Sequence, residues 1–74
     1  MKTQTYYSIN LKIGSSDDRF EYCGYDGSKL IYNPRQQLWT TSSRKTAIEE
    51  CKMIQETEIE YGVLAEVVKH EVEI

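Results

Sequence analysis

The sequence predicts an α+β fold, a small antiparallel-rich sheet of about four strands with one helix packed on one face, in the order β-β-β-α-β. Early in the chain, apolar residues alternate with polar ones. An Asp26-Gly27 turn signal then separates two short apolar runs, and apolar residues recur at helical spacing after Ser42-Ser43. A chain of 74 residues is long enough for one domain, so we expect residues 1–74 to form a single unit.

The first predicted strand covers residues 4–13. Tyr7, Ile9, Leu11 and Ile13 occupy every second position, which is the pattern of a strand buried on one face. Turn-forming residues follow at positions 14–18 and predict that the chain reverses there.

A hairpin is predicted next, with strands at residues 19–25 and 28–33 joined by a type I′ turn at Asp26-Gly27. In this register Tyr25 pairs with Ser28, Cys23 with Leu30, and Glu21 with Tyr32. The large side chains then divide between the two faces, with Cys23, Tyr25, Leu30 and Tyr32 on one and Phe20, Tyr22 and Ile31 on the other. Pro34 ends the second strand because proline has no N–H to donate.

After a polar connection at residues 35–37, residues 38–41 are expected to form a short extended stretch or a loop tucked onto the core. Ser42 or Ser43 is the expected N-cap of the helix, although Thr46 and Glu49 also fit a capping box in a later register. The helix is expected to end between Gln55 and Tyr61. Its apolar positions are Ala47, Ile48, Cys51 and Ile54.

Gly62 suits either the end of this helix or a turn. The β-branched run at residues 63–74 predicts a last strand. In it Val68, His70, Val72 and Ile74 face one way.

The net charge of −3 is unevenly distributed. Residues 1–45 carry seven Lys/Arg and four Asp/Glu, whereas residues 46–74 carry two Lys and eight Glu. A strongly positive stripe is the usual sign of a duplex-DNA binder, and the acidic balance argues against one. The glutamates suit either a solvated surface or a basic partner.

The sequence offers little for catalysis, metals or cofactors. Cys23 and Cys51 are 28 positions apart with no CxxC spacing, so a zinc site is not supported and reduced cysteines are expected. His70 is the only histidine, and we expect a structural role for it at the edge of the core. The predicted protein is therefore not an enzyme and has no cofactor. With no apolar run long enough for a membrane span and no signal peptide, a cytoplasmic location is expected.

Tyrosine is the one residue type that is unusually frequent, with six in 74 residues. One helix covers only one face of a sheet, so part of the hairpin's apolar side chains should remain uncovered. Tyrosine is well suited to such contact surfaces. We expect contacts with a partner at Tyr22, Tyr25, Tyr32, Trp39, Glu49, Glu56 and Glu60.

Several sequence elements resemble small accessory proteins encoded by phages and prophages of Gram-positive bacteria. They are the Tyr-containing hairpin with Asp26-Gly27, the Leu-Trp-Thr-Thr and Ser-Ser-Arg-Lys-Thr-Ala stretches at residues 38–47, and the Val-Val-Lys-His-Glu-Val-Glu ending at residues 67–73. The resemblance covers roughly residues 18–74 as a pattern of elements. It implies a cytosolic, non-catalytic protein that binds a host or phage macromolecule, and some such proteins inhibit bacterial defence systems, including as anti-CRISPR proteins.

The leading hypothesis is therefore a small protein-interaction module that inhibits a host protein or a defence system such as CRISPR, by occlusion or acidic mimicry. An alternative is single-stranded nucleic-acid binding by Arg19, Lys29 and Arg35 beside the hairpin tyrosines. A third is a homodimer formed through the spare sheet face or the C-terminal edge strand.

Overall fold

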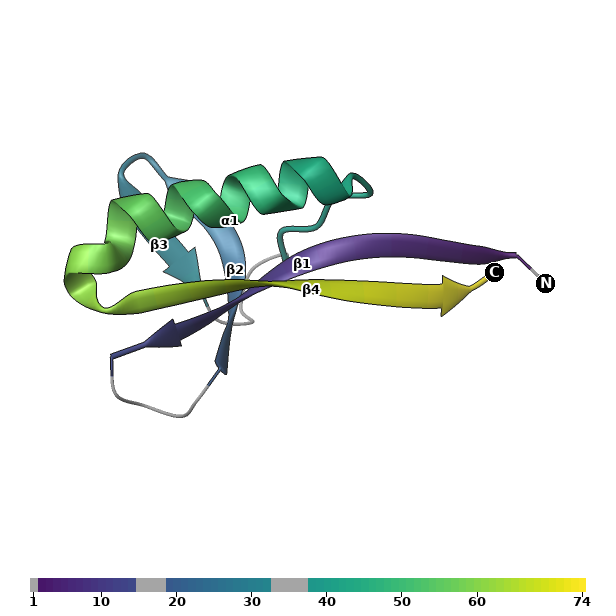
Figure 1. Cartoon of the computed structure of the whole chain (residues 1–74), viewed down its shortest axis with the longest axis horizontal. Coiled ribbons are helices and arrows are strands. Elements are labelled where there is room, and N and C mark those ends of the chain that lie inside the picture. Colours follow the sequence, from purple (N-terminus) through teal and green to yellow (C-terminus); the bar gives the residue numbers. More distant parts are fainter. Residues whose placement is uncertain (1, 15–18, 33–37) are drawn as a thin grey trace.

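A four-stranded antiparallel sheet with one helix on one of its faces makes up the protein (Figure 1). The computed structural model describes residues 2–14, 19–32 and 38–74. The elements are β1 (Thr3–Ile13), β2 (Arg19–Asp26), β3 (Lys29–Tyr32), α1 (Arg44–Glu58), the short 3-10 helix η1 (Ile59–Tyr61) and β4 (Val63–Glu73). The strands lie in the order β3-β2-β1-β4. The predicted fold class and element order are confirmed.

The longest part of the sheet is the ribbon formed by β1 and β4. These strands pair along their whole length, from Ile13 opposite Val63 to Thr3 opposite Glu73. The Ile74 N–H donates to the Lys2 carbonyl at 3.0 Å, which closes the far end of the ribbon. Both termini therefore lie together at one end of a molecule 44 Å long (Figure 1).

The β2–β3 hairpin differs from its prediction. Asp26 pairs with Lys29, so the two turn residues are Gly27 and Ser28 rather than Asp26 and Gly27. Tyr22 pairs with Tyr32 but Gly24 already pairs with Ile31, which makes Cys23 the extra residue of a β-bulge. Gly24 has a φ of 107°, a backbone conformation that L side chains rarely adopt.

The bulge overturns the expected division of side chains between the two hairpin faces. Because one residue is added, Tyr22 and Tyr25 point to the same side of β2 although they are three positions apart. Their rings contact each other edge to face, with centroids 6.1 Å apart. Leu30 lies opposite Tyr25, and with Phe20 it also packs on the core, so these four side chains gather on the face toward α1.

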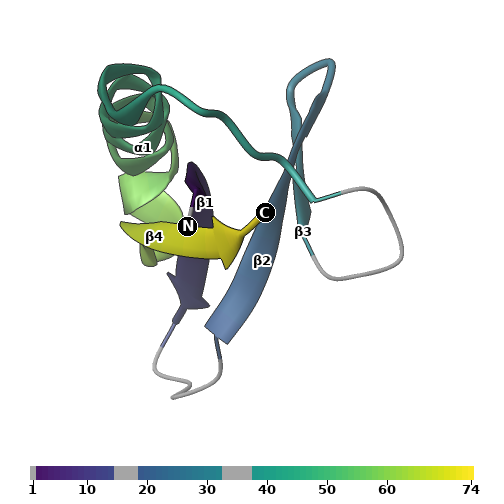
Figure 2. The ribbon, with the colours of Figure 1, turned by 90° about the vertical axis from the view of Figure 1, so that its right-hand side faces the viewer.

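Residues 39–41 fill a gap inside the sheet. β2 pairs with β1 only at Asn10–Lys12, and beyond that point the two strands separate. The Trp39 N–H donates to the Tyr22 carbonyl at 3.1 Å, and Thr41 and Tyr7 exchange backbone hydrogen bonds of 2.7 and 3.0 Å. Of the two predicted alternatives for residues 38–41, a short extended stretch or a loop tucked onto the core, the structure shows a segment without regular secondary structure that bridges to β1 at Thr41 and packs Trp39 on the core. Figure 2 shows this segment crossing from the hairpin side to α1.

The ends of α1 follow local sequence signals. Ser43 is the N-cap, and its hydroxyl accepts a hydrogen bond from the Thr46 N–H at 3.2 Å. A capping box starting at Thr46 is not formed, because Thr46 already lies inside the helix. The helix tightens into η1 and ends at Gly62, whose φ of 72° is left-handed and whose N–H donates to the Ile59 carbonyl.

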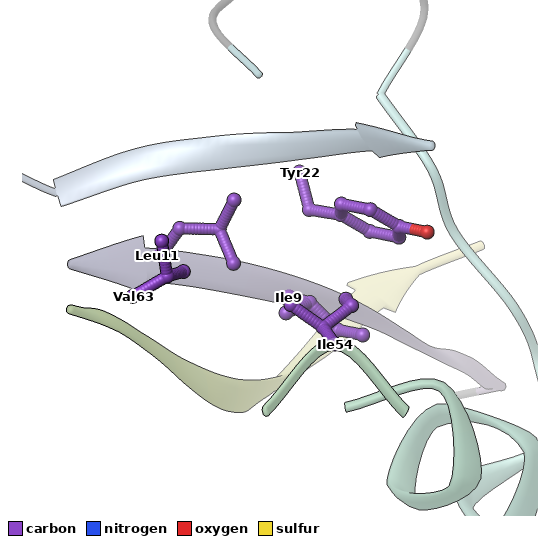
Figure 3. Close-up of a cluster of buried hydrophobic side chains, with 5 residues drawn as sticks. All are labelled: Ile9, Leu11, Tyr22, Ile54 and Val63. Atoms are coloured by element: carbon purple, nitrogen blue, oxygen red, sulfur yellow. The ribbon is translucent and has the colours of Figure 1, made fainter. Parts of the chain in front are cut away.

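The core lies between α1 and the face of the sheet that carries Ile9 and Leu11 (Figure 3). The helix contributes Ala47 and Ile54, both fully buried. Tyr22 is the largest fully buried side chain. Ile48, predicted for the same helix face, is instead 44% exposed at the flank.

Residues 15–18 of the turn predicted at residues 14–18 lie outside the described residues, as do residues 33–37, which contain Pro34 and the predicted connection at residues 35–37. Within residues 2–14, 19–32 and 38–74, no helix is both long and apolar enough to cross a bilayer.

Candidate protein-binding surfaces

Tyr22 was predicted to lie on an uncovered surface, and the structure shows that this expectation is wrong. Its side chain is completely buried between β2 and α1. Its hydroxyl donates a hydrogen bond of 2.5 Å to a carboxylate oxygen of Glu50. Burial, then this hydrogen bond and the negative charge of Glu50, raise the pKa of Tyr22 well above its ordinary value. Tyr22 therefore anchors the hairpin to the helix and is not available to a partner.

Tyr25 makes a second hydrogen bond of the same kind, to a glutamate eight positions further along α1. It is half-buried, and its hydroxyl donates to a carboxylate oxygen of Glu58 at 3.2 Å. Burial and the nearby charge of Glu58 raise the pKa of Tyr25 to about 12. Glu50 and Glu58 were absent from the predicted site, and their tyrosine partners are 28 and 33 positions away, beyond the reach of any local pattern.

The other two predicted aromatic contacts differ in exposure. Trp39 is half-buried, with its ring centroid 5.6 Å from that of Tyr22. Tyr32 packs edge to face on Phe20 at 5.3 Å but keeps 41% of its surface exposed. Of the four predicted aromatic residues, Tyr32 is the one that presents a large exposed surface.

The three predicted acidic contacts, Glu49, Glu56 and Glu60, are all exposed. They do not form a continuous acidic surface with Tyr22 and Tyr25, which face the interior. On α1, Lys45 precedes Glu49 by four residues and Lys52 precedes Glu56 by four, so these two carboxylates each have a cation one turn away. The outer side of α1 is therefore of mixed charge.

The uncovered surface that the fold does provide is the sheet face away from α1, here called the open face. Odd-numbered residues of β1 and β4 point to the core, so the even-numbered ones point to the open face. By this alternation the two strands contribute Gln4, Tyr6, Ser8, Asn10, Lys12, Leu64, Glu66, Val68, His70 and Val72, and Leu38 and Thr40 from the segment before α1 lie beside Gln4, Tyr6 and Val72.

The open face is apolar enough for a contact surface. Leu64 is 54% exposed and Val72 is 46% exposed, although both are large aliphatic residues. Five residues line a shallow depression of about 470 Å³ at the end of the ribbon that carries the termini, namely Gln4, Tyr6, Leu38, Thr40 and Val72. Val72 lines this depression, and an exposed aliphatic side chain beside a depression is typical of surfaces that bind other proteins, whereas Leu64 lies near the other end of β4.

Tyr6 and His70 form a stacked aromatic pair on this face, next to the depression. Their rings stack with centroids 4.6 Å apart and planes 9° from parallel. The His70 Nε2 lies 2.7 Å from the Ser8 hydroxyl, which is buried at 3% exposure. The hydroxyl is too buried to attack a substrate, so this serine–histidine contact serves to fix the imidazole ring.

A second apolar hollow lies between α1 and β4. This shallow groove of about 480 Å³ is lined by Ile48, Cys51, Lys52, Gln55, Glu56, Ala65 and Val67. It contains Glu56 from the predicted acidic set and the half-buried thiol of Cys51. Burial, and after it the charge of Glu66, raises the pKa of Cys51, which keeps the thiol protonated and weakens it as a nucleophile.

Cys23, at the bulge, is also a thiol, and its Sγ donates to the Glu21 carbonyl at 3.6 Å. Burial first and the charge of Glu21 second raise the pKa of Cys23. Among the described residues, no group of three or more His, Cys, Asp or Glu side chains is placed to hold a metal ion.

Comparison of the chain with protein-family models, with curated proteins and with solved structures gave no match.

Proposed function

We propose that this protein is a small binding module that recognises another protein through the open face of its sheet. The observation that supports this most directly is the one-sided cover of the sheet. α1 shields the core face, whereas Leu64 and Val72 remain about half exposed on the other. The stacked Tyr6–His70 pair adds a preorganised aromatic contact, which costs little conformational entropy on binding.

This proposal moves the contact surface away from the residues first expected. Tyr22 and Tyr25 use their rings and hydroxyls inside the molecule, and Glu49 and Glu56 each have a lysine one turn away. Occlusion of a partner by the open face is therefore better supported than mimicry of nucleic acid by an acidic surface. Inhibition of a host protein or of a defence system is a finer proposal that rests on the resemblance to phage proteins.

Single-stranded nucleic-acid binding by the hairpin has less support. Stacking needs exposed ring faces beside cations. Tyr22 is buried and Tyr25 is half-buried against α1, which leaves Tyr32 as the accessible hairpin ring.

The experiment is partner capture from a bacterial lysate by cross-linking, with three versions of the protein. The wild type is compared with Leu64→Lys/Val72→Lys on the open face and with Ile59→Lys/Tyr61→Lys as the control, which alters exposed residues of η1 by the same charge. We expect the wild type and the control to capture the same protein and the open-face variant to lose it. NMR spectra of the purified complex should then show shifts of the Tyr6, Val68 and His70 side-chain signals.

Capture that survives the open-face substitutions would overturn the proposal. Binding of a labelled oligonucleotide at low salt, abolished by Tyr32→Ala and unaffected at the open face, would favour the nucleic-acid alternative.

A further inference from the structure

β4 is an edge strand whose outward backbone groups are only partly satisfied. The Ile74 N–H points to β1, where it donates to Lys2, so the even-numbered residues of β4 pair inward. By alternation, the N–H and C=O groups of the odd-numbered residues point outward, away from β1. Unpaired groups along an edge of this kind form a template for another strand.

Gln55 of α1 caps the first part of this edge. Its side-chain Nε2 donates to the Val63 carbonyl and its Oε1 accepts from the Ala65 N–H, both at 3.0 Å. The carboxamide thus replaces a neighbouring strand at these two residues. Beyond Ala65, the outward N–H and C=O groups of Val67, Lys69, Glu71 and Glu73 are all uncapped, since no hydrogen bond reaches them from the described part of the chain.

These four residues are symmetric about His70, and that symmetry selects one way for two copies to pair. In an antiparallel pair about a two-fold axis at His70, Val67 lies opposite Glu73 of the second copy and Lys69 lies opposite Glu71 of the second copy. Every uncapped residue then pairs with another uncapped one. Neither residue that Gln55 already caps is needed.

Charge selects the same register. With the axis at His70, Lys69 and Glu71 make two opposite-charge pairs across the new contact, one on each side of the axis. Moving the axis to Lys69 places two lysines opposite each other and leaves no opposite-charge pair. Moving it to Glu71 places Lys69 opposite Glu73 of the second copy but adds two glutamates opposite each other at the axis. The Lys69 and Glu71 side chains are 59% and 58% exposed and lie 3.2 Å apart in the single chain, so they are positioned to extend an ion-pair network across the edge.

We propose that β4 pairs with β4 of a second copy, antiparallel about a two-fold axis at His70, to form one continuous sheet. On the open face this register places Val68 opposite Val72 of the second copy and covers aliphatic surface that is now exposed. The two Tyr6–His70 stacks become neighbours across the axis. The open face would then be a single surface shared by two copies, and this assembly does not depend on whether that face also binds another protein.

Charge-reversal variants test the register. In Lys69→Glu, glutamates oppose glutamates at both pairs, and in Glu71→Lys, lysines oppose lysines. We expect each variant alone to weaken self-association, measured by sedimentation equilibrium, by at least about tenfold. An equimolar mixture of the two variants restores opposite charges at both pairs, and should form a heterodimer with an affinity within about threefold of the wild type.

The double variant Lys69→Glu/Glu71→Lys should also dimerise, since it swaps both charges. Lys45→Glu on α1 makes the same charge change as Lys69→Glu away from the edge and should dimerise normally. Circular dichroism checks that each variant is folded. On the wild type alone, exchange of the Lys69 and Glu71 amide protons should slow as the protein concentration rises.

Three results would each overturn the proposal. They are a wild-type protein that stays monomeric at millimolar concentration, single variants that dimerise as well as the wild type, and a mixture of variants that stays monomeric. A dimer whose amide protection falls on β3 instead of β4 would assign the contact to the other edge.

Discussion

The hydroxyl of Tyr22 on β2 and the carboxylate of Glu50 on α1 lie 2.5 Å apart and join the hairpin to the helix. Tyr22 is completely buried, so its ring and its hydrogen bond act together at the centre of the molecule. Loss of the ring and loss of the hydroxyl can be separated by substitution.

Tyr22→Phe should lower the free energy of unfolding by about 1–2 kcal/mol, because a half-buried carboxylate loses its donor while the ring stays in place. Tyr22→Ala should cost about 3–5 kcal/mol, since it also leaves a cavity. Urea denaturation measures both. Tyr61→Phe, at a residue that is 72% exposed, is the matched control and should change stability by less than about 0.5 kcal/mol. Equal effects of the two Tyr→Phe changes would contradict the role of the Glu50 contact.

The raised pKa values of Tyr22 and Tyr25 predict loss of stability in alkali. The folded protein keeps these phenolic protons when the unfolded chain, whose tyrosines titrate at about pH 10, has lost them. Their contribution is therefore fully present below about pH 10 and declines as the pH rises toward the folded value of about 12 for Tyr25. The free energy of unfolding should fall over this range.

The control for this effect is Tyr22→Phe/Tyr25→Phe, which has lower stability at neutral pH but should show a shallower alkaline decline. A tyrosinate absorbance titration reports the same groups directly. If the double variant declines as steeply as the wild type, other groups cause the loss.

Substitution of Gly24 should destabilise the protein through backbone strain rather than through steric contact with neighbouring residues. A Cβ at this position would meet nothing within 4 Å, but the φ of 107° strains any L residue. Gly24→Ala should cost about 1–2 kcal/mol. A synthetic chain with D-alanine at position 24 fits positive φ and should be as stable as the wild type in thermal unfolding. A loss of similar size with both enantiomers would point to crowding instead of strain.

The Gln55 side chain should stabilise the first part of the β4 edge, at Val63 and Ala65. Gln55→Ala removes both hydrogen bonds to Val63 and Ala65, and we expect a loss of about 1–2 kcal/mol together with faster amide exchange at Ala65. Gln55→Glu keeps an acceptor for the Ala65 N–H but has no donor for the Val63 carbonyl, so its effect should be smaller at Ala65. Unchanged exchange at Ala65 in Gln55→Ala would show that the cap contributes nothing.

Much of the fold was predictable because the signals are local. The alternation through Ile9 and Leu11, the Ser43 cap and the left-handed Gly62 each act within a few residues, and the structure confirms the elements they predicted. The face of β1 that meets the helix was also correctly predicted, since alternation fixes which side chains share a face.

The candidate surface was less predictable, and the reason is the bulge at Cys23. One extra residue reverses the alternation, so Tyr22 and Tyr25 share the inner face and the expected tyrosine surface is not formed. The open face was visible only in part, as the alternating run through Val68, His70 and Val72. Its other half, including Tyr6 and Leu38, depends on pairings between segments far apart in the chain.

The amino-acid sequence by itself determined which segments become strands and helix, because backbone propensity, capping and side-chain period depend on near neighbours. Only the tertiary structure decided which tyrosines are buried, which glutamates accept their hydroxyls and which part of the β4 edge is capped by Gln55. These outcomes depend on the packing of β2, α1 and β4 against one another, and burial and hydrogen-bond pairing are properties of that packing.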